Sequence, residues 1–126
     1  MKLNDIFSYA HTFDNILVHT DLFRAVDIPI SDKNSFFDKH YNFLKTKLSN
    51  KNIFFPAFNY SFCSTGLFDI KNDPISVGSL NNYLWENNIY KYRTHCPIFS
   101  FIAEKDIKNF KINLEKIIDP FGKESF

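Results

Sequence analysis

The polar residues best placed for chemistry follow a short apolar segment near the start of the chain. Asn15–His19 is typical of a buried strand in an α/β protein, and Thr20 and Asp21 come directly after it. Open α/β sheets bind their ligands at the carboxyl ends of the strands, so His19, Thr20 and Asp21 are candidate binding residues. The alternative is that His19 is only a hydrogen-bonded histidine at a strand end.

A second candidate binding segment consists of Ser76, Val77 and Gly78. Ser76 predicts the N-cap of a helix that runs to about Asn87. The N-terminus of a helix presents unpaired N–H groups and the positive end of the helix dipole, which suits a pyrophosphate. The alternative is that Ser76 only caps the helix and contacts no ligand.

Aromatic and charged residues outside these segments are candidates for a substrate pocket. Phe58, Tyr60 and Phe62 alternate, so they share one face if this segment is extended. They either wall an acceptor or pantetheine channel, with the Tyr60 hydroxyl orienting the ligand, or, for Phe58 and Phe62, belong to the core. Asp69 can bind an ammonium group or simply end a turn. Arg93 can pair with a phosphate or carboxylate, or lie solvated on the surface.

The composition excludes several classes of function. The net charge of +1 creates no strong field for nucleic acid or an anionic membrane. The two cysteines, Cys63 and Cys96, and the four histidines lack zinc-site spacing, so we expect no metal ion. No stretch approaches the roughly 18–20 apolar residues that span a bilayer, and no secretory signal is visible, so we expect a cytoplasmic protein.

Covalent catalysis by cysteine is not expected either. His95 and Cys96 are adjacent, and adjacent residues of a strand point to opposite faces, so these two would not activate each other there. We assign no catalytic residue in this chain. The sixteen Phe side chains fit a large core or an aromatic-walled pocket, although an AT-biased coding sequence explains the same excess.

A strand–helix–strand unit must position the first candidate residues. Ser31–Leu48 predicts a helix, in which Ser35 and Asp38 have the spacing of a capping box. Ile53–Phe55 predicts the second strand, which Pro56 ends. This order of elements predicts a right-handed parallel crossover.

The remaining elements predict a larger sheet. Ala57–Pro74 is a long non-periodic stretch of the kind that often lines a site. Ile98–Ala103 predicts a third strand, and the alternating Phe110, Ile112 and Leu114 predict a fourth. We therefore expect one α/β domain over residues 1–126, with a mixed, largely parallel sheet and flanking helices.

Five segments, in order, resemble the first part of the aminoglycoside N(3)-acetyltransferases, the antibiotic acetyltransferase family. They are Ile16–Leu22, Pro56–Cys63, Phe68–Leu80, Arg93–Phe101 and the tail Asp119–Phe126 with its P-F-G-x-x-S pattern. The nearer resemblance is to relatives thought to acylate amino sugars for surface polysaccharides. The resemblance therefore implies that the chain is the N-terminal portion of such a fold, incomplete at its C-terminus.

The resemblance also implies an activity. Such an enzyme uses acetyl-CoA or another acyl-CoA as co-substrate, needs no metal, and acetylates an amino group of an aminoglycoside or amino sugar. Antibiotic resistance and polysaccharide biosynthesis are the settings that it suggests. It adds Ser100 as a pocket candidate to Phe58, Tyr60, Asp69 and Arg93, and it makes the two binding segments above the cofactor platform.

The chain departs from the family pattern in two places. Many members have His-Pro where this chain has Cys96-Pro97, so the role of that histidine does not transfer to His95. Members also continue into a His-x-x-Glu segment that supplies the general base, and this chain contains none. The base is then expected from a missing segment or a separately encoded C-terminal half.

Two other functions stay open at this point. One is a truncated, catalytically inactive remnant that keeps part of the CoA-binding platform. The other is a small aromatic-rich interaction domain of unrelated fold. A truncated sheet would expose an unpaired strand edge and apolar surface, which predicts self-association.

Overall fold

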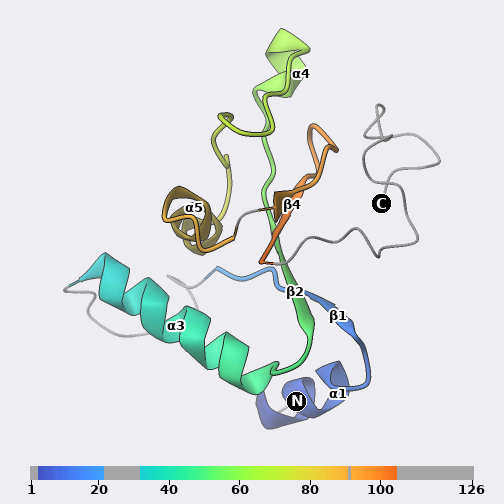
Figure 1. The fold of residues 1–126 in the computed structure, drawn as a ribbon, viewed down its shortest axis with the longest axis vertical. Helices are drawn as coiled ribbons and strands as arrows, with labels where there is room; N and C mark the ends of the chain where they lie inside the picture. The colour runs from blue at the N-terminus through green and yellow to red at the C-terminus, as the bar shows by residue number, and fades with distance from the viewer. Residues whose placement is uncertain (1–2, 22–31, 91, 105–126) are drawn as a thin grey trace.

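The computed structural model describes residues 3–21, 32–90 and 92–104, which fold as helices around a small mixed sheet (Figure 1). The elements are α1 (Leu3–Ala10), β1 (Asn15–Leu17), α3 (Lys33–Lys47), β2 (Asn52–Pro56), α4 (Phe62–Thr65), α5 (Ser79–Glu86), β3 (Tyr92–Arg93) and β4 (Phe101–Ala103). The strand order is β1-β2-β4-β3. β1 and β2 are parallel, and the other two pairs are antiparallel. The predicted α/β class and mixed sheet are confirmed.

The predicted strand–helix–strand unit is present as β1, α3 and β2. Ile16 pairs with Ile53 in the parallel register, and the N–H of Val18 donates to the carbonyl of Phe54 at 2.8 Å just beyond β1. The helix, predicted over Ser31–Leu48, begins at Lys33, and its N-cap is Asp32 rather than Ser35 of the capping-box pattern. Asp32 has an extended backbone and its side chain accepts from the N–H of Asn34, which satisfies a donor of the first turn and leaves Ser35 inside the helix.

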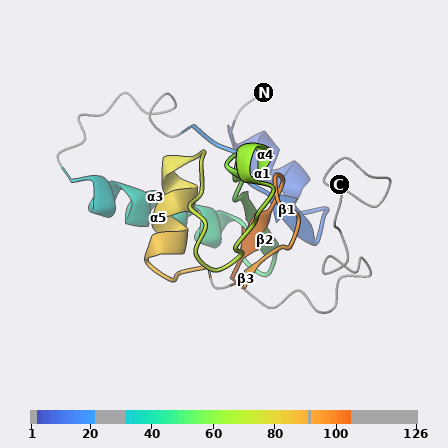
Figure 2. The ribbon, with the colours of Figure 1, turned by 90° about the horizontal axis from the view of Figure 1, so that it is seen from above.

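Helices α3 and α5 lie on the same side of the sheet (Figure 2). The rings of Phe37 and Tyr83 stack at 5.2 Å between the helices, and the Tyr83 hydroxyl donates to Asp38 at 2.7 Å. The core beneath them is apolar. Its most deeply buried members are Phe55, Ala57, Leu80, Leu84, Tyr90, Cys96 and Ile102. This packing fixes the direction of α5 against the sheet.

The third predicted strand is shorter than expected and has an unpredicted neighbour. β4 begins at Phe101 rather than Ile98, and it pairs with the two residues of β3. Thr94 closes this hairpin, since its N–H donates to the Phe101 carbonyl and its hydroxyl accepts the Phe101 N–H, each at 2.9 Å. The fourth predicted strand and the P-F-G-x-x-S tail lie outside the described residues.

Apolar side chains are exposed along the β1 edge of the described sheet. Leu17 is 53% exposed on β1, and Tyr9 is 67% exposed on α1. Ile6, Phe13 and Phe43 add to the exposed apolar side chains of this part of the chain. Self-association through this edge stays a prediction.

None of the helices in the described ranges is long and apolar enough to cross a membrane.

Candidate functional site

The chain beyond β2 is held by Ser76. The N–H of Ser76 donates to the carbonyl of Phe58 at 2.8 Å, and its hydroxyl accepts the N–H of Tyr60 at 3.1 Å. The prediction that Ser76 caps the helix is wrong, because this hydroxyl is already bonded and the cap position belongs to Gly78. Gly78 has φ 87°, a conformation that residues with side chains rarely adopt.

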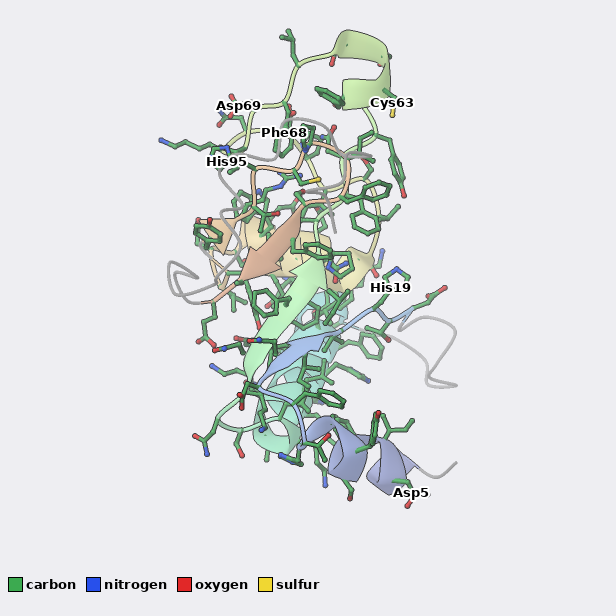
Figure 3. The ribbon with its side chains drawn as sticks, turned by 90° about the vertical axis from the view of Figure 1, so that its right-hand side faces the viewer. Asp5, His19, Cys63, Phe68, Asp69 and His95 are labelled. Carbon is green, nitrogen blue, oxygen red and sulfur yellow. The ribbon has the colours of Figure 1, made fainter. Side chains whose placement is uncertain are left out.

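The two predicted cofactor-binding segments lie on the same side of the molecule. In Figures 2 and 3 the chain after β1, with His19, passes beside the N-terminal end of α5. His19 and Asp21 are exposed, and Thr20 is half-buried. On α5, Val77 and Gly78 immediately precede the first helical residue. The structure therefore places the two candidate binding segments, His19–Asp21 and Ser76–Gly78, near each other, although about sixty residues separate them in the sequence.

The first turn of α5 has no side-chain cap. The first bond at this end runs from the N–H of Asn82 to the carbonyl of Gly78 at 3.0 Å. Among the described residues, the N–H groups of Ser79, Leu80 and Asn81 form no hydrogen bond. These donors point out of the helix end, where the helix dipole is positive.

Asn81 is a buried polar residue on α5, and its side-chain amide lies against Gly78. It is only 3% exposed, and its side chain forms no hydrogen bond in the described part of the chain. It lies on the same short helix as the apolar Leu80 and Leu84, three positions after Gly78.

Arg93 and Ser100, both predicted as substrate-binding residues, lie together in the interior. Arg93 is 2% exposed, so the interpretation of a solvated surface arginine is wrong. Its Nε donates to Ser100 Oγ at 3.2 Å, Nη1 to the Asp73 carbonyl at 2.5 Å, and Nη2 to the Ala57 carbonyl at 2.8 Å. Ser100 Oγ also donates to the Ala57 carbonyl at 2.5 Å. Arg93 thus joins the loop before α5, the end of β2 and the hairpin.

The surroundings of Arg93 are aromatic. Its guanidinium carbon lies 5.1 Å from the centre of the Phe68 ring and 5.5 Å from that of Trp85. Burial lowers the pKa of Arg93 to about 10, so the group is charged at neutral pH. Because three of its donors already bind protein atoms, Arg93 positions the site rather than offering a full fork to a ligand.

The remaining substrate-binding candidates divide into an aromatic pair beyond β2, Phe58 and Tyr60, and a turn at Asp69. Phe58 is half-buried, with its ring 5.6 Å from that of Phe99, whereas Tyr60 is 48% exposed. Phe62 begins α4, so the expected extended alternation does not reach it. The Asp69 carboxylate accepts from the side chain of Asn72 at 2.7 Å and from two backbone N–H groups, which makes it the organiser of a turn. The Asn72 side chain is the main reason that the pKa of Asp69 is lowered.

Cys96 is buried and His95 is exposed, and both follow β3 instead of lying on a strand. Across residues 3–21, 32–90 and 92–104, no three His, Cys, Asp or Glu side chains are grouped so as to hold a metal ion.

A separate hollow of about 340 Å³ lies at the opposite end of β2. Two lysines line it, but both have partners. Lys45 forms an ion pair with Glu104 at 2.8 Å, and Lys51 donates to the carbonyl of His11 at 2.9 Å. Both lysines and Glu104 are therefore engaged within the protein.

We found no match to this chain among models of protein families, among curated proteins or among solved structures. The resemblance to the aminoglycoside N(3)-acetyltransferases therefore rests on the five segments quoted above.

Proposed function

We propose that this chain is the binding portion of an acyl-CoA-dependent N-acyltransferase of the aminoglycoside N(3)-acetyltransferase type. Its reaction transfers an acetyl group to an amino group of an aminoglycoside or amino sugar. The observation that carries the proposal is the juxtaposition of the chain around His19 with the uncapped start of α5. The strand ends of α/β sheets bind ligands in this way, and a helix N-terminus suits a diphosphate.

The described residues would bind and orient the two substrates. The N–H groups at the start of α5 suit the diphosphate of acetyl-CoA, which supplies the acetyl group as a thioester. Phe58 and the exposed Tyr60 follow the carboxyl end of β2, and they would line the path of the pantetheine or the acceptor sugar. Arg93 would keep this end of β2 and the loop before α5 in register.

The proposal assigns no general base to this chain. The amine must lose a proton as it attacks the thioester carbon and the CoA thiolate leaves. In the family that the chain resembles, a His-x-x-Glu segment takes this proton. A further segment or a separately encoded second half would supply it here, within a sheet that is larger and more parallel than the four described strands.

Coenzyme A binding tests the proposal directly. Trp85, the chain's only tryptophan, lies on α5 and reports on this region by fluorescence. We expect saturable CoA binding in fluorescence and calorimetric titrations. The variant Lys51→Met should bind equally, because Lys51 lies at the opposite end of β2. Absence of CoA binding at millimolar concentration would refute the proposal and favour an unrelated interaction domain.

Turnover separates the enzyme from the inactive remnant. Release of free thiol from acetyl-CoA in the presence of an amino sugar or aminoglycoside would show that the chain, alone or with a co-purifying second half, is catalytic. CoA binding without thiol release by the protein purified from its natural source would favour the remnant.

A further inference from the structure

The hollow of about 340 Å³ lies between the C-terminal end of α3, the start of β2 and the end of β4. A tight turn from α3 into β2 forms one wall, where the N–H of Lys51 donates to the carbonyl of Leu48 at 3.1 Å. Asn50 lies in this turn with φ 66°, a left-handed conformation that asparagine adopts more readily than most residues. The pairing of Phe54 with Ala103 holds the opposite wall in place. Backbone bonds therefore define the hollow.

The lining of the hollow combines a polar rim with apolar side chains. The rim offers both donors and acceptors, from Lys45, Ser49, Asn50, Asn52 and Glu104. The apolar members are Leu48, Ile53, Phe54 and Ala103, most of which are buried. Small-molecule sites commonly have this composition, in which an apolar surface supplies contact area and a few polar groups fix the orientation of the ligand.

The charges around the hollow are balanced. Lys45 pairs with Glu104 at 2.8 Å, and the ammonium of Lys51 lies 3.9 Å from the carboxylate of Asp14. The C-terminal end of α3 adds the negative end of the helix dipole on the same side. The charged side chains that line the hollow within the described ranges thus all have partners. This balance favours a neutral ligand over an anion such as phosphate.

The paired groups keep capacity for further hydrogen bonds. An ammonium has three donors and a carboxylate has several acceptor positions, whereas Lys45 and Glu104 share one bond. Asn52 donates its side-chain amide to Asn15 at 2.9 Å, and its side-chain oxygen accepts no bond from the described residues. Each hydroxyl of a sugar is both a donor and an acceptor. A ring with several hydroxyls therefore matches this mixture of groups.

A buried hydroxyl next to the ion pair has no partner. It belongs to Tyr41, whose hydroxyl forms no hydrogen bond in the described part of the chain. The ammonium of Lys45 lies 5.5 Å from the centre of the Tyr41 ring, so the unpaired hydroxyl adjoins the rim. Buried polar groups without partners are rare, and departures of this kind concentrate at functional sites. The rim is therefore not arranged for stability alone.

We propose that this hollow binds a neutral, hydroxyl-rich small molecule of the size of one sugar ring. Lys45, Glu104 and the side-chain oxygen of Asn52 bind its hydroxyls, and Ile53 and Phe54 contact its C–H groups. A volume at the lower end of the range for small-molecule pockets suits a single ring. The site lies at the opposite end of β2 from Phe58 and Tyr60, and it does not rest on the acyl-CoA function.

Amide NMR titrations of the unmodified chain provide the first test. The neutral probes are methyl glucoside, methyl galactoside, methyl mannoside and inositol, and the charged probes are inorganic phosphate and ethylammonium. At least one neutral probe should shift the backbone resonances of Ser49–Asn52 saturably below about 100 mM. Absence of such shifts with all four neutral probes would overturn the site. Equal or tighter binding of a charged probe at Ser49–Asn52 would overturn the assignment of a neutral ligand.

The variant Lys45→Met provides the second test, with Lys39→Met as its control. Both lysines are exposed on α3, so both variants should fold, but Lys39 does not line the hollow. We expect Lys45→Met to weaken binding of the best neutral probe by about tenfold, the value of one hydrogen bond to a charged group. Lys39→Met should leave the affinity unchanged. Equal affinities in the two variants would contradict the role of Lys45.

The shifted resonances separate this inference from the proposed function. Sugar shifts confined to Phe58 and Tyr60 would place the sugar on the proposed acceptor path and overturn this site. Sugar binding at Ser49–Asn52 in a chain that binds no CoA would support this site while the acyl-CoA function fails. CoA binding without any sugar response at Ser49–Asn52 would have the opposite meaning.

Discussion

Replacing Arg93 tests whether its buried guanidinium stabilises the fold through hydrogen bonds. In Arg93→Lys the charge remains, but one ammonium cannot reach acceptors spread around a planar fork. Arg93 donates to Ser100, Asp73 and Ala57, and we expect lysine to keep one of these bonds. Two lost charge-assisted bonds, at about 1.5 kcal/mol each, should lower the free energy of unfolding by about 3 kcal/mol.

A second variant, Arg93→Met, separates the hydrogen bonds from the burial of charge. Methionine fills much of the space between Phe68 and Trp85 without a charge. If the desolvation cost of the guanidinium exceeded the value of its bonds, this variant would be more stable than the original chain. We expect a loss of about 3–5 kcal/mol instead, because three segments lose their common donor and the Asp73 carbonyl loses this bond.

Urea unfolding, followed by circular dichroism and by Trp85 fluorescence, measures both effects. With a slope of about 1.5 kcal/mol per molar urea, a loss of 3 kcal/mol shifts the midpoint by about 2 M. Lys39→Met removes an exposed cation from α3 and should change stability by less than about 0.5 kcal/mol. An Arg93→Met chain that unfolds at the same or higher urea concentration would refute the reasoning.

Three further predictions concern backbone, burial and pH. Gly78→Ala should be about 1–2 kcal/mol more destabilising than Gly66→Ala in thermal unfolding, because both have positive φ but only the Cβ at 78 meets a buried amide. Tyr41→Phe should raise the free energy of unfolding by about 1 kcal/mol, seen as a higher urea midpoint. The reason is that the buried Tyr41 hydroxyl has no hydrogen-bond partner within the described ranges. The Asn72 side chain is the main cause of the lowered pKa of Asp69. The ionised Asp69 carboxylate therefore stabilises the fold above the ordinary carboxyl pKa, and this stabilisation is lost as pH falls through the lowered pKa. The difference in melting temperature between the original chain and Asp69→Asn should therefore shrink between about pH 5 and about pH 2, and a constant difference would contradict it.

The parallel β1–α3–β2 unit could be predicted because its signals are local. Asn15–His19 and Ile53–Phe55 are short apolar runs, and the helix between them has a periodic apolar face. The caps could not be predicted from residue type alone. Ser35 and Ser76 are both good cap residues, yet Ser76 uses its hydroxyl for the N–H of Tyr60. Whether a serine caps a helix depends on whether distant backbone groups compete for its hydroxyl, and cap propensities carry no information about such distant groups.

The burial of Arg93 also lay beyond sequence reasoning. Arginine is normally exposed, and the two-residue strand that carries Arg93 has no periodicity to reveal it. Its carbonyl acceptors come from residues 20 and 36 positions earlier in the chain. Only the folded arrangement of β2, the loop before α5 and the hairpin brings these acceptors together, so neighbouring residues in the sequence give no signal.

Two polar centres of the described fold, Arg93 and the start of α5, differ in which of their hydrogen-bond donors have partners. Arg93 was a phosphate candidate by residue type, but its donors bind Ala57, Asp73 and Ser100. The start of α5 has the weaker residue type, yet its donors lack acceptors among the described residues. The centres are also linked, because Arg93 stacks on Trp85 of α5 and holds the chain that leads into Gly78. Residue type alone therefore does not reveal which donors are available, because backbone carbonyls from two distant segments hold Arg93, whereas the first N–H groups of a helix stay unpaired where no side chain caps them.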